Sequence, residues 1–397
     1  MQKADEFGFE LEGLSVNWGK MISRSREAAK QLGRGVEGLF RKNGVEYRQG
    51  TGKLIAPGKV EVEGETEQAE HVVLATGGRP RTFPGIEPNE NRLMTSKEAM
   101  ILKTQPDRLV IMGAGAIGME FAYFYHTFGT DVTVIEMEDR ILPQEDPEIS
   151  EEIQSIYQED GMNILTGTAV EEARQEDSEV LVELQSDRDP VVADAGLIAL
   201  GIQPNTDDLW DPDLNIRTAD GGWIDVKDDY STSLPGVYAI GDVIGPPWLA
   251  HVASHEGIKM VEGIFGDGEP GPLNYDDVPA CTFCQPQVAS VGTTEPEARE
   301  EYDAVKVGKF PFRASGRAVA VGETDGFVKL IFAGDYDELV GAHILGHGAT
   351  ELIAELGLAK RLETSPEEIF ESVHAHPTLA ESVMEAALDA KDRVIHA

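Results

Sequence analysis

Cysteine and long apolar runs are scarce in this 397-residue sequence. It has no apolar run of about 18 or more residues, which excludes an ordinary membrane-spanning helix, and residues 1–6 lack the apolar core of a signal peptide. Its two cysteines, Cys281 and Cys284, form a Cys-x-x-Cys pair, but no second pair and no close histidine pair completes four metal ligands. We therefore expect a cytoplasmic protein without a metal site. We favour a structural role for the cysteines over a redox dithiol, because they stand at the start of an apparent strand.

Basic residues are also few, with 33 against 72 acidic residues and a net charge of −39. This charge argues against nucleic acids or anionic membranes as partners. At low ionic strength, repulsion among these charges destabilises the compact state. In about 1 M salt the screening length falls to about 3 Å, which would relieve this repulsion. We hypothesise an acidic surface of the halophilic type, adapted to a salt-rich cytoplasm.

The most informative motif lies in residues 109–136, where a strand, the spacing Gly-x-Gly-x-x-Gly and a helix precede a second strand that ends at Glu136. Gly113 permits a tight turn, Gly115 lets the backbone approach a pyrophosphate, and Gly118 lets the helix pack closely on the strand. The pyrophosphate would lie at the helix N-terminus, and Glu136 can accept hydrogen bonds from a ribose diol. The motif predicts a dinucleotide site but does not by itself choose between NAD and FAD.

The other segments predict further helices and strands. We expect a helix over 17–43 and short antiparallel strands over 45–76. A strand ending at Ile240 places Asp242 at its carboxyl end, where open α/β sheets bind ligands. A turn-rich linker, 266–272, marks the main domain boundary. Further strands are expected near 163–170, 179–185, 195–201, 287–291, 304–312, 318–322, 326–333 and 338–345, and helices over 147–160, from 248 to about 265, from 295 and over 348–362.

The last motif, residues 374–381, contains the clearest chemistry. His376 precedes Pro377, which disfavours the α conformation and projects the ring from a turn. Glu381 falls in the first turns of the next helix and can bond one ring N–H. The pair predicts a general acid/base that works near neutral pH. A single histidine in a turn is more often structural, so the other motifs must decide between these interpretations.

Six motifs in order resemble the pyridine nucleotide-disulfide oxidoreductases, and within them the dihydrolipoamide dehydrogenase branch. They are Gly50-Thr-Gly52, Ala75-Thr-Gly-Gly78, the motif of residues 109–136, Thr232 to Asp242, Trp248 to His251 and His374 to Glu381. The resemblance implies an α/β protein with two Rossmann-like nucleotide-binding domains, the first incomplete, followed by an α+β dimerisation domain. The implied domains are FAD-binding (1–106 and 228–272), NAD-binding (107–227) and dimerisation (273–397).

The resemblance also implies the ligands and the reaction. In such an enzyme, His376 with Glu381 deprotonates dihydrolipoamide, whose electrons pass through a disulfide and FAD to NAD. The expected partners are a second copy of the chain and the lipoyl domain of a 2-oxo acid dehydrogenase or glycine cleavage complex. FAD would contact Gly52, Thr76, Gly77, Gly78, Asp242, Trp248, Leu249, Ala250 and His251. NAD would contact Gly113, Ala114, Gly115, Ala116, Ile117, Gly118, Met119, Glu120, Glu136, Val170 and Gly201.

One departure from the family pattern concerns the start of the chain. The family begins with an earlier glycine motif for FAD and a redox pair, Cys-x4-Cys, and neither precedes Gly113 here. We therefore expect an amino-terminally truncated chain with little bound flavin and no lipoamide turnover. The alternatives are a non-catalytic, NAD-binding dimeric scaffold and another disulfide reductase of the same family.

Overall fold

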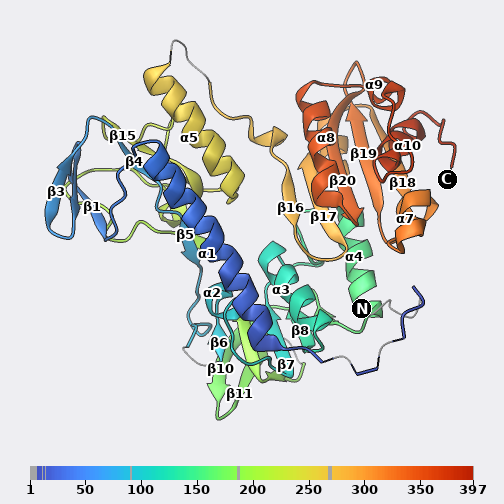
Figure 1. Cartoon of the computed structure of the whole chain (residues 1–397), viewed down its shortest axis with the longest axis horizontal. Helices are drawn as coiled ribbons and strands as arrows, with labels where there is room; N and C mark the ends of the chain where they lie inside the picture. The colour runs from blue at the N-terminus through green and yellow to red at the C-terminus, as the bar shows by residue number, and fades with distance from the viewer. Residues whose placement is uncertain are drawn as a thin grey trace.

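The structure, a computed structural model, describes residues 7–10, 12–13, 15–89, 92–185, 188–266 and 271–396. The elements form three groups (Figure 1): β1–β5 with β14, β15 and α5, then β6–β13 with α2–α4, and finally β16–β20 with α6–α10. Among the described residues, no helix is long and apolar enough to cross a membrane. The expected linker 266–272 lies partly outside the described residues.

The first long element, helix α1 (Trp18–Lys42), confirms the helix expected over 17–43. The Asn17 side chain caps it by accepting a hydrogen bond from the Lys20 N–H at 2.9 Å. Trp18 anchors its first turn, because the indole N–H donates to the Leu102 carbonyl at 2.7 Å. The helix therefore starts against the second group of elements, and Figure 1 shows it running toward β4 and α5 of the first group.

Three small sheets make up the first group. Strands β1, β2 and β3 pair antiparallel, β5 pairs antiparallel with β14, and β4 pairs parallel with β15. The expected strand at 45–48 is wrong, because Gly52–Ala56 takes the place beside β2. The antiparallel pairing expected for the last strand of this segment is also wrong, since Val72 and Leu74 are buried against β15. The elements are β1 (Gly52–Ala56), β2 (Lys59–Val62), β3 (Glu65–Gln68), β4 (Val72–Leu74), β5 (Gly78–Pro80), β14 (Ile202–Pro204), β15 (Val237–Ala239) and α5 (Ala250–Phe265).

A five-stranded parallel sheet, in the order β6-β13-β7-β8-β9, forms the second group. Alternate side chains of β7 enter two cores: Leu109 and Ile111 pack in the core that contains α3 and α4, while Val110 and Met112 pack against the small sheet β10–β12. Strand β6 precedes the predicted domain boundary at 107 and yet joins this sheet. The elements are β6 (Leu93–Met94), α2 (Ser96–Ala99), β7 (Arg108–Met112), α3 (Ala116–Thr127), β8 (Asp131–Ile135), α4 (Pro147–Glu159), β9 (Asn163–Leu165), β10 (Val170–Glu176), β11 (Glu179–Leu184), β12 (Val191–Ala193) and β13 (Ala195–Ile198).

The third group is an antiparallel sheet in the order β16-β17-β20-β19-β18. One face packs against α8 and α10, and the other meets the second group. The strand expected at 318–322 is wrong: this segment is a helix, capped by the Ser315 side chain and ended by the left-handed Gly322. The elements are β16 (Ala280–Thr282), β17 (Gln287–Gly292), α6 (Glu295–Glu301), β18 (Val305–Pro311), α7 (Gly316–Val321), β19 (Phe327–Ala333), β20 (Glu338–Gly346), α8 (Ala349–Arg361), α9 (Pro366–Glu371) and α10 (Glu381–Asp389).

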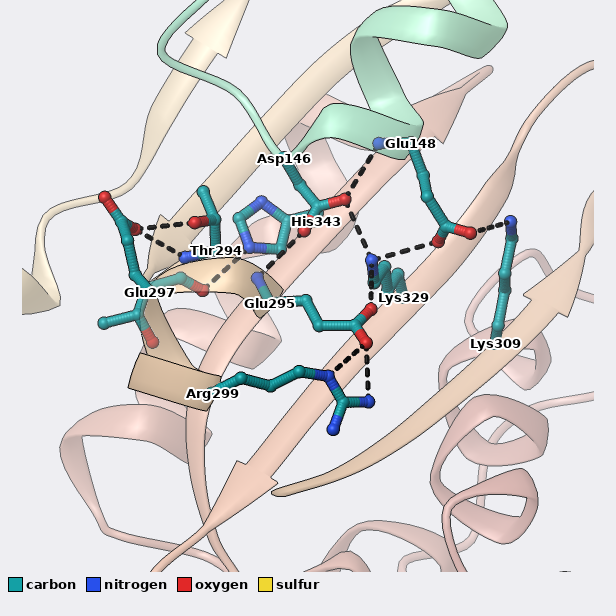
Figure 2. Close-up of polar contacts among 10 residues, drawn as sticks. Asp146, Glu148, Thr294, Glu295, Glu297, Arg299, Lys309, Lys329 and His343 are labelled. Atoms are coloured by element: carbon teal, nitrogen blue, oxygen red, sulfur yellow. Dashed lines mark hydrogen bonds and ion pairs between the residues drawn. The ribbon is translucent and has the colours of Figure 1, made fainter. Parts of the chain in front are cut away.

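A buried ion cluster joins the second and third groups (Figure 2). The Lys329 Nζ lies 2.9 Å from Asp146, 3.0 Å from Glu148 and 2.7 Å from Glu295. Burial alone would raise the pKa of Asp146, but hydrogen bonds from the Glu295 N–H and Lys329 outweigh it and hold the pKa below its usual value. Because Asp146 also caps α4, the cluster fixes that helix against the sheet of the third group.

Candidate active site

The three glycines of the dinucleotide motif occupy three different environments. Gly113 has φ +100°, and a Cβ there would lie 2.4 Å from the Ala199 carbonyl oxygen. A Cβ on Gly118 would lie 2.0 Å from the Gly113 oxygen, so this side of α3 packs directly on the loop. Gly115, by contrast, faces open space at the N-terminus of α3. A phosphate can therefore approach the loop at Gly115, where the N–H groups of the helix point outward.

Glu136 is fixed against this loop. It is buried, with one carboxylate oxygen accepting from the Ala114 N–H at 2.6 Å and the other from the Glu138 N–H at 3.0 Å. A carboxylate offers about four acceptor positions, so two oxygens held in this way can still accept from a diol. The spacing of the motif predicted Glu136 at the end of β8, but it did not predict the hydrogen bond from the Ala114 N–H.

Glu120, on the second turn of α3, faces the third group of elements. One of its oxygens accepts from the Phe283 N–H at 2.8 Å, and burial raises the pKa of its carboxyl. Phe283 stands between the two cysteines, which are both free. Burial raises the pKa of the Cys281 thiol and raises that of Cys284 to about 11. Both thiols are therefore poor nucleophiles at neutral pH.

A second set of predicted residues surrounds the turn after β4. The Thr76 hydroxyl donates to the Asn205 carbonyl at 2.9 Å, and the Asn205 side chain donates to the Thr76 carbonyl at 2.9 Å. Gly77 has φ +70° with open space around it, and Gly78 begins β5. The turn is thus held rigidly while its backbone stays accessible. Gly52 lies apart from it in sequence, at the start of β1.

Asp242 lies at the carboxyl end of β15, as expected, in the short 3-10 turn Gly241–Ile244. Asp242 is half-buried, and this burial raises the pKa of its carboxyl. Nearby in sequence, Trp248 stacks on Trp223 with ring centroids 5.3 Å apart. Leu249 and Ala250 open α5, and the His251 ring nitrogen lies 2.9 Å from the Pro279 carbonyl oxygen.

The structure brings His376 and Glu381 together. The His376 Nδ1 lies 2.9 Å from one Glu381 oxygen, and the other oxygen accepts from the Thr378 N–H at 2.9 Å. Burial acts to raise the pKa of Glu381, but these two partners outweigh it and lower the pKa. The His376 side chain is 80% exposed, which leaves Nε2 accessible. Neighbouring His374 is anchored to Glu355 of α8 at 2.8 Å, a contact between segments that the sequence did not predict.

Within one chain, the histidine and the dinucleotide loop lie on opposite sides of the sheet β16–β20 of the third group. Helix α10, which begins at Glu381, packs on the face covered by α8, whereas α3 and α4 adjoin the other face. Figure 1 shows α9 and α10 remote from α3. The two sets can complete one site only if a second protomer supplies one of them. Among the NAD-side residues, Gly201 follows β13 with φ +90°, and Val170 opens β10.

Comparison with known proteins gives consistent matches along the chain. Residues 3–257 match the family described as pyridine nucleotide-disulphide oxidoreductase, and residues 278–387 match its dimerisation domain. The dihydrolipoyl dehydrogenase of Bacillus subtilis is 40% identical, with 100% of this chain and 86% of that protein covered. The enzyme of the same name from Zymomonas mobilis is 39% identical, with the same coverage.

Solved structures agree with these matches. LpdA from Mycobacterium tuberculosis superimposes with a TM-score of 0.90 at 26% identity, covering 97% of this chain and 85% of that one. The HOCl-induced flavoprotein disulfide reductase RclA from Escherichia coli, as its Cu(II) complex, gives a TM-score of 0.87 at 25% identity, covering 97% and 87%.

Proposed function

Since the chain belongs to the pyridine nucleotide-disulphide oxidoreductase family and is an NAD-dependent flavoprotein disulfide oxidoreductase, we propose that its substrate is dihydrolipoamide. Its cofactors are FAD and NAD, and its carboxy-terminal part is a dimerisation domain that makes it a homodimer. The observation that carries the substrate proposal is the His376–Glu381 pair, because a dithiol must lose a proton before it can act as a nucleophile.

The chain's own residues account for the proton transfer. Glu381, accepting at its other oxygen from the Thr378 N–H, holds the Nδ1–H of His376 at 2.9 Å. This tautomer leaves Nε2 as the acceptor. We propose that Nε2 takes a thiol proton from dihydrolipoamide and leaves a thiolate. The exposed position of His376 in one chain fits an approach to the nucleotide-binding face of a partner.

The observed geometry is compatible with both cofactors. Gly115 leaves an open space at the start of α3, which a Cβ would narrow and which suits a pyrophosphate. The half-buried Asp242 carboxyl can accept hydrogen bonds from a hydroxyl-rich ribitol. When bound, FAD supplies two-electron transfer between a dithiol and nicotinamide. We propose that FAD is held by Gly52, Thr76, Gly77, Gly78, Asp242 and Trp248 to His251. We propose that NAD is held by residues 113–120, Glu136, Val170 and Gly201.

The finer assignments belong to the same proposal. We place the FAD-binding parts at 1–106 and 228–272, the NAD-binding domain at 107–227 and the dimerisation domain at 273–397. The proposed partner is the lipoyl domain of a 2-oxo acid dehydrogenase or glycine cleavage complex, and the proposed location is the cytoplasm. Co-purification with such a complex from fractionated cells tests both.

The decisive assay measures NADH formed from dihydrolipoamide and NAD. Where residues 1–397 form NADH in this assay, replacing His376 with glutamine should lower the rate by about 100-fold or more, the usual contribution of a general base. His126→Gln, at the end of α3, serves as the control and should leave the rate unchanged. Loss of activity in both variants, or in neither, would refute the assigned role of His376.

The same assay separates the alternatives. The reaction also needs a redox disulfide, which the two free thiols of this chain, the half-buried Cys281 and the buried Cys284, do not supply. If residues 1–397 bind NAD tightly but form no NADH, the scaffold interpretation holds for this chain. RclA is named as a disulfide reductase, so NADH-dependent reduction of other disulfides without any activity on lipoamide would favour a different reductase.

A further inference from the structure

One buried carboxylate outside the predicted site joins three segments of the chain. Glu256, in the middle of α5, is only 2% exposed. One of its oxygens accepts from the Gly241 N–H at 2.6 Å, and the other accepts from the Tyr275 hydroxyl at 2.7 Å. Both partners lie outside α5, so the side chain serves as a bridge rather than as a surface charge.

The first bond of this bridge controls the turn that presents Asp242. Gly241 has φ +72°, and a Cβ there would lie 3.1 Å from the Ala253 Cβ, so the turn packs closely on α5. Ile240, the residue before the turn Gly241–Ile244, offers no side-chain hydrogen bond to it, and the Glu256 carboxylate accepts from the first N–H of the turn instead. Because Asp242 is the next residue, any shift at Gly241 moves its carboxyl.

The second bond connects the turn to the dimerisation domain. Tyr275 begins the short 3-10 segment Tyr275–Asp277. Burial, and next the bond to Glu256, raise the pKa of its hydroxyl, which therefore stays protonated and donates. Asp277 at the end of this segment pairs with Lys360 of α8 at 3.0 Å. A continuous set of contacts thus runs from α8 to the turn at Asp242.

We propose that Glu256 is a positioning residue of the flavin site, which holds the Gly241–Ile244 turn, and with it Asp242, in register with α5 and the start of the dimerisation domain. This inference rests on the proposed function only in assigning FAD to Asp242. Glu256 itself touches neither cofactor in this assignment. It acts through the backbone of Gly241.

The test compares Glu256→Ala and Glu256→Gln with Glu262→Gln, a matched change at an exposed position of α5. Three quantities are measured on the full chain: FAD affinity, NAD affinity and hydrogen exchange over 241–244. Glu256→Ala removes a charge-assisted acceptor and should weaken FAD binding about tenfold or more. Glutamine can accept from the Gly241 N–H and donate to the Tyr275 oxygen, so Glu256→Gln should weaken it by no more than about threefold.

The expected pattern is a selective loss. Glu256→Ala should weaken FAD binding and speed hydrogen exchange at 241–244 while its NAD affinity stays unchanged. Glu262→Gln should change none of the three quantities. Equal losses for FAD and NAD, or a glutamine variant as weak as alanine, would overturn the positioning role. If Glu256→Ala does not fold, Tyr275→Phe should still weaken FAD binding a few-fold, and no effect there counts against the proposal.

Failure of the proposed function would appear differently. If the unmodified chain binds no FAD at any accessible concentration, the assignment of FAD to Asp242 is wrong. Hydrogen exchange then decides alone whether Glu256 holds the turn, because that measurement needs no flavin. Unchanged exchange in Glu256→Ala would reject the inference whatever the flavin result.

Discussion

Replacing Lys329 with methionine should destabilise the junction between the second and third groups of elements. The substitution keeps an unbranched side chain in a position that is 1% exposed but removes the cation beside Asp146, Glu148 and Glu295. Asp146 is wholly buried and would keep its charge without a counter-ion, apart from its backbone donors. Glu148 and Glu295 retain contact with solvent, so the loss of the Lys329 charge destabilises them less.

The magnitude follows from the geometry. At an effective dielectric constant of about 20, unit charges 2.9 Å apart attract by about 6 kcal/mol before desolvation is subtracted. Removing one partner of a buried pair costs about 3–5 kcal/mol in free energy of unfolding. With a urea m-value of about 3 kcal/mol/M, the unfolding midpoint should fall by at least about 1 M.

Urea unfolding followed by circular dichroism measures this effect. Lys309→Met is the matched control. Lys309 contacts Glu148 at 3.3 Å from a partly exposed position, so its replacement should cost no more than about 1 kcal/mol in free energy of unfolding. Adding Asp146→Asn to Lys329→Met should restore part of the loss, since the unpaired charge disappears. A Lys329 variant as stable as the Lys309 control would refute the reasoning.

Three further predictions use other features of the chain. Burial raises the pKa of Glu145 to about 7, so the folded chain binds a proton that the unfolded chain has already lost. The free energy of unfolding should therefore fall as pH rises from about 4.5 to about 7. Urea midpoints measured across that range should lose this slope in Glu145→Gln. Gly118→Ala should lower the free energy of unfolding by about 1–3 kcal/mol, because the new Cβ would meet the backbone oxygen of Gly113. Gly115→Ala should leave the urea midpoint unchanged, and calorimetry should show weaker NAD binding. Finally, the net charge of −39 predicts a melting temperature that rises with KCl; a flat response would reject salt adaptation.

The opposite placement of His376 and the dinucleotide loop bears on how the dimer works. Helix α10 and the loop lie on different sides of the sheet β16–β20, and the exposed His376 side chain faces outward from its own chain. If His376 is the proton acceptor, as we propose, its place in the dimerisation domain makes the site depend on association. The Glu256 bridge adds a second link, because contacts run from the turn at Asp242 through the segment 275–277 to Lys360 of α8, within the dimerisation domain.

The sequence by itself determined the features whose physics is local. Glycine sterics and the strand–turn–helix pattern predicted the loop at 113–118, and capping and periodicity predicted α1 and α4 almost to the residue. The prediction was wrong at 45–48 and 318–322, where short apolar patterns had no strand partner. The pairing of Glu381 with His376 was predictable because the two residues are only five positions apart, with Pro377 forming a turn between them.

Only the tertiary structure decided the contacts between distant segments. Lys329 lies 183 residues from Asp146, and Phe283 lies 163 residues from Glu120. Gly241 and Glu256 are closer in sequence, but their bond depends on how α5 packs on the turn. Such contacts follow from strand register and from which face of a sheet each side chain enters, and these are fixed only when the whole core assembles. Local residue patterns therefore located the candidate site, while long-range packing supplied the partners that orient it.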